Sequence, residues 1–159
     1  MTLNEFFPPL LHGNFEMLKM TIADLSDADI LVRPTAGANH ANWQIGHALK
    51  AEHGLVSGCK LQMPELPAGF VDRYTKHTAG VDDASKFATK AELLELFTKV
   101  RTASADHAAK LSAERWAEKG PASFAPTVAA TFDALISHLS MHVGQLQVIR
   151  RKLGKPILF

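Results

Sequence analysis

The most constraining feature of this chain is its last long stretch, Thr127 to Leu153, which has the apolar spacing of one helix. Leucine and valine recur there three or four residues apart, at Leu135, Leu139, Val143 and Leu146. That spacing places them on one face, which must pack against other helices. Gly154, followed by Pro156, is a typical helix stop. We therefore predict a helix with Thr127 as its N-cap, ending at Lys152 or Leu153.

Three further stretches predict long helices. The first opens after Pro8-Pro9 and runs to about Leu25. The second starts near His40 or Asn42 and runs to about Cys59. The third begins with a capping box over residues 89–92 and continues to about Leu111. With no convincing strand and no internal repeat, the pattern indicates an all-α fold, a helical bundle in one domain over residues 1–159.

The connection between the second and third predicted helices, Lys60–Phe87, is unusually long for a compact domain. Pro64, Pro67, Gly69 and Gly80 interrupt it, and no helical or strand period survives. Connections of this length are crossovers or functional flaps. We expect this one to pack against the helices and to help shape a substrate pocket.

Composition excludes several function classes. The chain of 159 residues carries 17 basic and 16 acidic residues, so its charge does not predict nucleic acid or an anionic membrane as partner. No apolar run reaches the length of a membrane span, and Met1–Pro9 lacks the features of a signal peptide. The single cysteine, Cys59, excludes an internal disulfide and is expected to be a small buried residue rather than a nucleophile. We predict a cytoplasmic location, which suits reduced thiols.

Two histidines of the last helix suggest a metal site. His138 and His142 lie four residues apart and project from the same helix face. Two imidazoles alone do not make a competent site. His47, between two core-type residues of the second helix, is the best candidate for a third ligand. The alternative is that each histidine is a core residue satisfied by hydrogen bonds.

Other histidines fit less well. His53 is turned about 120° away from His47 along the helix. His40 is expected at the start of its helix, whereas His12 is a candidate for lining the same cavity. We interpret His77 and His107 as solvated.

Two glutamines lie close enough along their helices to orient the candidate ligands. Gln145 follows His142 by nearly one turn, and Gln44 precedes His47 by nearly one turn. Side chains of this kind commonly accept the second ring N–H of a ligating histidine. A plain structural role is the alternative for each.

Several other chemistries are missing from the sequence. There is no His-Glu-x-x-His motif, no Glu-x-x-His pair and no Cys-x-x-Cys. These absences argue against a thermolysin-like protease, a carboxylate-bridged di-iron bundle and a thiolate metal site. No residue is assigned as the general base.

At this point the motifs resemble a known family. The shared elements are Trp43-x-x-Gly46-His47 and His138-x-x-x-His142-x-Gly144-Gln145, with Arg33-Pro34 and Arg150-Arg151-x-Leu153-Gly154. The chain is similar over nearly its whole length to the DinB/YfiT-like superfamily of metalloenzymes. The resemblance implies an up-down-down-up four-helix bundle. It also implies a divalent metal ion, zinc or nickel, held by His47, His138 and His142.

The resemblance carries functional expectations as well. Members are often homodimers, and several use the metal to activate a low-molecular-weight thiol, as S-transferases or as a maleylpyruvate isomerase. Our leading hypothesis is a metal-dependent transferase or hydrolase acting on a small molecule, with Arg33, Arg73 and Lys76 as possible substrate anchors. The alternatives are a non-enzymatic bundle that binds metal or a small ligand in a stress response, and a site that stays empty.

Overall fold

The computed structural model describes residues 1–158, which are mostly helical with one small two-stranded sheet. In chain order the elements are α1 (Leu3–Ile22), the 3-10 helix η1 (Asp29–Leu31), α2 (Ala41–Gly58), α3 (Phe70–Arg73), the 3-10 helix η2 (Ala84–Lys86), α4 (Lys90–Ala108), α5 (Ala113–Ala117), β1 (Lys119–Ala122), β2 (Ala125–Thr127) and α6 (Val128–Lys152). Within this range, no helix combines the length and the apolarity that crossing a bilayer requires.

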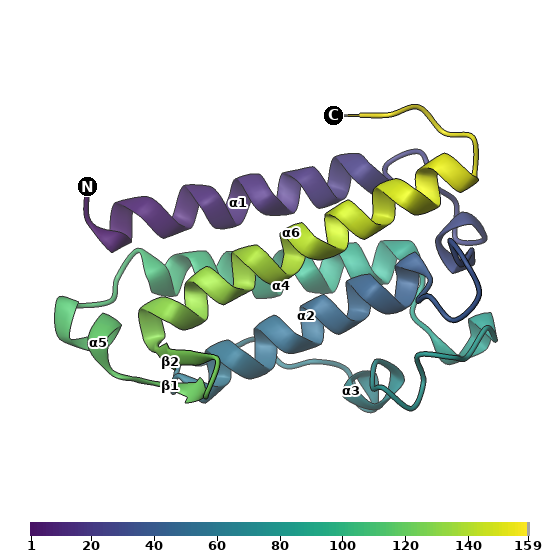
Figure 1. The fold of residues 1–159 in the computed structure, drawn as a ribbon. Helices are drawn as coiled ribbons and strands as arrows, with labels where there is room; N and C mark the ends of the chain where they lie inside the picture. The colour runs from purple at the N-terminus through teal and green to yellow at the C-terminus, as the bar shows by residue number, and fades with distance from the viewer. Residues whose placement is uncertain (159) are drawn as a thin grey trace.

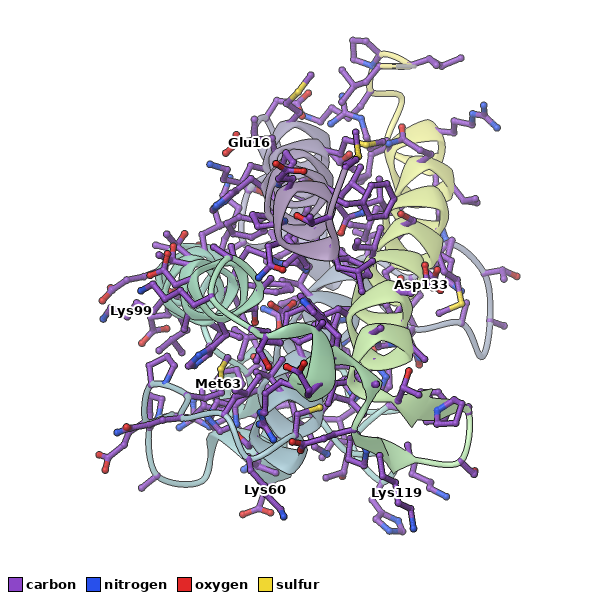
Figure 2. All side chains as sticks on the ribbon, turned by 90° about the vertical axis from the view of Figure 1, so that its left-hand side faces the viewer. Glu16, Lys60, Met63, Lys99, Lys119 and Asp133 are labelled. Carbon is purple, nitrogen blue, oxygen red and sulfur yellow. The ribbon has the colours of Figure 1, made fainter. Side chains whose placement is uncertain are left out.

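Four long helices lie side by side and enclose the core (Figure 1). Both α1 and α2 pack against α4 and α6. Seen from the end of the molecule, Glu16, Lys99 and Asp133 point outward from α1, α4 and α6, while apolar side chains fill the space between (Figure 2). This division of polar and apolar faces is the one that the helical periodicity predicts.

The helix starts follow local capping chemistry. The predicted capping box at Thr89 and Glu92 opens α4, and the Thr127 side chain accepts the Ala130 N–H at 3.1 Å to open α6. The prediction for the first helix was wrong at both ends, because α1 begins before the two prolines and ends at Ile22. A second capping box, Thr2 with Glu5, satisfies the free N–H groups at that earlier start.

The long connection is held down on α2 by Tyr74, as its apolar residues predicted. The Tyr74 ring lies against Gly46, where an added Cβ would come within 2.1 Å of a ring carbon. Its hydroxyl donates to Asn42 Oδ1 at 3.3 Å and accepts the Ala88 N–H at 3.0 Å. Burial raises the pKa of Tyr74 to about 12, so the hydroxyl keeps its proton.

A β-hairpin precedes α6, in a region where the sequence pattern predicted no strand. The strands β1 and β2 pair antiparallel, with Lys119 opposite Thr127 and Ala122 opposite Ala125. An added Cβ at Gly120 would lie 2.0 Å from the Ala125 carbonyl oxygen, so only glycine permits this close approach. The strands are too short to show a period of two, and each contains a proline, which is why the pattern did not reveal them.

Candidate metal centre

Three histidines converge where α2 faces α6. His47 comes from α2, and His138 and His142 come from successive turns of α6. One ring nitrogen of each lies within 4.8 Å of the others. The Nε2 atoms of His138 and His142 are 3.1 Å apart. Helical spacing alone relates only His138 and His142. The packing of α2 on α6 adds His47 to this pair.

The cluster has dimensions that fit one metal ion. A zinc ion lies about 2.1 Å from each histidine nitrogen, so two nitrogens that share it are at most about 4.2 Å apart. The His138–His142 separation of 3.1 Å satisfies this limit, at an angle of about 95° at the ion. A tetrahedral ion separates its nitrogen ligands by about 3.4 Å, so the widest separation in the cluster, up to 4.8 Å, has to shorten by up to about 1.4 Å when an ion binds. The donor set thus fits a divalent transition metal.

His142 is oriented by two glutamines: Gln145, as predicted, and Gln44, which was expected to orient His47 on its own helix and instead reaches across to His142. Its Nδ1 lies 2.9 Å from Gln145 Oε1 and 3.2 Å from Gln44 Oε1. An amide oxygen only accepts, so Nδ1 carries the proton and the lone pair is on Nε2, which faces His138. His142 is only 5% exposed, and burial lowers its pKa to about 4.

His47 is held by a stacked indole and by the long connection. The Trp43 ring stacks on the imidazole with centroids 4.7 Å apart and planes 6° from parallel. The indole Nε1–H donates to the Thr75 carbonyl at 3.1 Å. Burial, together with the charges of His138 and Lys50, lowers the pKa of His47 to about 4, against a backbone hydrogen bond with Tyr74. Burial also lowers the pKa of His138. All three imidazoles are therefore neutral at neutral pH, the state that binds metal.

A cavity of about 470 Å³ opens beside the cluster, with His47 and His138 in its wall. The rest of its described lining comes from α2, the hairpin turn and α6: Ala51, Leu55, Phe124, Ala134 and Ser137. We predicted that the Lys60–Phe87 connection would shape this pocket, and for this cavity that prediction was wrong. The connection lines a different cavity, of about 510 Å³ against α4. Its contribution to the cluster is to hold Trp43 and His47.

The remaining histidines stand apart from the cluster. His12 lies on the exposed face of α1, so the structure does not bring it to the other three. His40 caps α2 as predicted, its Nδ1 accepting the Trp43 N–H at 3.0 Å. His53 contacts the Pro64 carbonyl at 3.0 Å. The prediction for His107 was wrong in part, because its ring is half-buried and lies 2.7 Å from the Gln62 carbonyl oxygen.

Sequence reasoning missed two contributors to the site. Trp43 lies four residues before His47, so helical spacing could have shown that their rings share a face. Phe124 lies between two short strands and carried no comparable signal.

A buried ion pair lies on the α2–α4 side of the core. Arg101 Nη2 lies 2.7 Å from Glu52 Oε2, and Ser104 Oγ donates to Glu52 Oε1 at 2.8 Å. Burial raises the pKa of Glu52 against the opposing pull of Arg101. Cys59 is buried as predicted, and burial raises its pKa, which makes it a poor nucleophile.

The family model of the DinB superfamily matches residues 10–146 of this chain. The chain belongs to the DinB superfamily. This confirms the family that the tryptophan–histidine and histidine–glutamine motifs resembled. A solved relative of the same fold is a conserved protein of Enterococcus faecalis, with a TM-score of 0.70 and 15% identity. The alignment covers 98% of this chain and 99% of that one, and at this identity it shows the fold alone. Curated proteins yielded no match to this DinB superfamily chain.

Proposed function

We propose that this DinB superfamily protein is a divalent-metal-dependent enzyme. The reaction class that fits best is transfer of a low-molecular-weight thiol, or a related hydrolysis or isomerisation. One observation carries the proposal: three neutral imidazoles converge within 4.8 Å, and two of them face a cavity large enough for a small molecule.

His47, His138 and His142 would hold the ion, with zinc or nickel as the favoured metals. Three protein ligands leave at least one coordination position open, which is the arrangement of catalytic rather than structural sites. When bound, such an ion supplies Lewis-acid activation, which lowers the pKa of a water molecule or a thiol toward neutrality.

The remaining work falls to residues of the chain. Gln145 and Gln44 keep the Nδ1 proton of His142 in place, so that Nε2 stays available. Trp43 fixes the plane of His47 by stacking. The cavity walls would place aliphatic and aromatic side chains beside a group that reaches the open position.

Two finer features belong to the same proposal. The packing of α1 and α2 on α4 and α6 supports a four-helix bundle of up-down-down-up order, with the crossover between α2 and α4. A homodimer is supported by exposed apolar side chains on α1 and α6: Leu3, Phe6, Leu10, Met17 and Met20 on α1, and Met141 and Val148 on α6. The cytoplasmic location and the absence of a nucleic-acid or membrane partner stay predictions from composition.

The experiment that tests the function is a thiol screen on protein of known metal content. Protein purified without a histidine tag is loaded with zinc or nickel and mixed with small thiols and electrophiles. Metal-dependent consumption of thiol supports the transferase. Bound metal without turnover of any thiol or ester would favour the alternative, a non-enzymatic protein that binds metal or a small ligand.

A further inference from the structure

The cavity beside the histidine cluster has uncharged walls. Ala51 and Leu55 of α2 and Ala134 of α6 give it aliphatic sides. Its polar groups, among the described lining residues, are the Ser137 hydroxyl and the two imidazoles. Apart from these three groups, the described lining offers a ligand only apolar contacts.

Phe124 stands at the turn of the hairpin and forms part of the cavity lining while 70% exposed. The hairpin beneath it is firmly placed. Pro121 packs so closely against Gly58 of α2 that a Cβ added to Gly58 would lie 2.6 Å from the Cβ of Pro121. At the base of the hairpin, the Val128 N–H donates to the Glu118 carbonyl at 2.9 Å. A large aromatic ring is thus presented at the cavity on an anchored support. An apolar ligand group that packs on this ring would bury its exposed surface, which is favourable.

No lysine or arginine is among the described lining residues of this cavity, so the predicted anchors Arg33, Arg73 and Lys76 all lie outside it. Arg33 pairs with Asp82 at 2.6 Å and donates to three backbone carbonyls. Arg73 lines the other cavity, against α4. Lys50, whose charge acts on His47, donates to the Tyr74 carbonyl at 3.3 Å and is not part of the described cavity lining. In the metal-free protein, a carboxylate or sulfonate entering this cavity would lose water without gaining a cationic partner from the described lining residues.

We propose that this cavity selects an uncharged, apolar part of the substrate, an aromatic ring or a short branched alkyl group, which packs between Leu55 and Phe124 beside the metal position. The role of this selection in a reaction rests on the proposed function. The preference for an uncharged ligand does not depend on that function, because it comes from the cavity walls and not from the ion.

The test measures, by fluorine NMR, the binding of three matched ligands to metal-free protein. The ligands are 4-fluorobenzyl alcohol, 4-fluorobenzoate and 4-fluorobenzylammonium. They share one ring and differ in charge. We expect the neutral alcohol to bind at least about tenfold more tightly than either ion, because neither ion finds a partner in the cavity. Equal or tighter binding of a charged ligand, or no binding of the alcohol at millimolar concentration, overturns the proposal.

Two variants locate the binding. Phe124→Ala should weaken the alcohol by about fivefold or more, because it removes an aromatic contact. Phe6→Ala removes an exposed phenylalanine from α1 and should leave affinity unchanged. Ala134→Asp places a carboxylate in the wall and should shift the preference to the ammonium ligand, with circular dichroism checking the fold. An unchanged affinity for the alcohol in Phe124→Ala, together with an unchanged charge preference in a folded Ala134→Asp, would place the ligand elsewhere and overturn the proposal.

The same titration with zinc separates this inference from the proposed function. If zinc does not bind and the neutral ligand is still preferred, the metalloenzyme proposal fails while the apolar cavity stands. If zinc binds and the metal-free protein shows no preference for the neutral ligand, the metal centre stands while the apolar cavity fails.

Discussion

The Nε2 atom of His142 lies 3.1 Å from the Nε2 atom of His138, one turn away along α6. The Nδ1 proton of His142 is taken up by glutamine oxygens, so its Nε2 has only a lone pair to offer. Two lone pairs facing each other at this distance repel, so either the His138 proton or a metal cation lies between them. This contact is where the metalloenzyme hypothesis and the hydrogen-bonded core hypothesis separate.

Metal content distinguishes the two states. Wild-type protein should hold about one equivalent of zinc or nickel per chain, and His142→Ala should lose it, because two imidazoles alone bind weakly. His12→Ala changes an exposed histidine outside the cluster and should keep the metal. The measurement is elemental analysis of protein prepared without a tag or chelator. Metal retained in His142→Ala would rule out this ligand set.

Gln145 should act on the metal through His142. Replacing it with alanine removes the closer acceptor of the Nδ1 proton, and losses of about 10- to 100-fold in metal affinity are typical of such changes. Gln147→Ala is the matched control, because that side chain donates to Thr21 Oγ1 on α1. Chelator competition gives both affinities. Equal affinities in the two variants would leave Gln145 with a plain structural role.

The metal-free protein should lose stability as the pH falls. The pKa values of His47 and His142 are lowered from 6.5 to about 4 in the folded state. The unfolded chain therefore takes up protons at these rings below about pH 6.5, before the folded chain does. Their contribution to stability is complete above pH 6.5 and is lost as the pH falls through 4. Urea unfolding at several pH values should show a smaller loss in His142→Gln than in wild type. An identical pH dependence in both would contradict the burial of this ring as a neutral group.

The buried pair of Glu52 and Arg101 should be costly to break one partner at a time. Glu52→Ala leaves a buried guanidinium without its carboxylate, and the free energy of unfolding should fall by about 3 to 5 kcal/mol. The double variant Glu52→Leu, Arg101→Met should recover much of this loss, because no unpaired charge remains. The exposed pair of Glu95 and Lys99 is the control, and Glu95→Ala should cost no more than about 0.5 kcal/mol. Chemical denaturation measures all three, and a small loss in Glu52→Ala would show that water reaches the pair.

The proposed homodimer should depend on the exposed apolar faces of α1 and α6. Leu10→Glu and Met141→Glu each place a charge there and should convert a dimer into a monomer in light scattering coupled to gel filtration. Val71→Glu changes an exposed valine on α3 and should leave the mass unchanged. A dimer that survives both α1 and α6 variants would have to use another surface.

Local patterns were enough to predict the long helices and to place His138 and His142 on one helix face. The capping box at Thr89 and the spacing of His138 and His142 are properties of neighbouring residues on one helix, so the sequence reveals them directly. Helix ends are harder to predict: α1 begins before the prolines because the capping box of Thr2 and Glu5 satisfies its first N–H groups.

What the sequence by itself determined is therefore the set of amphipathic helices and a pair of imidazoles on one of them. Only the tertiary structure decided that His47 meets that pair, that Gln44 reaches across from α2 to His142, and that Phe124 rather than the long connection lines the adjoining cavity. The physical reason is range. Helical periodicity relates residues within a few turns, whereas His47 and Gln44 meet residues of α6 about 90 or more positions away. Only the packing of α2, the hairpin and α6 sets these distances.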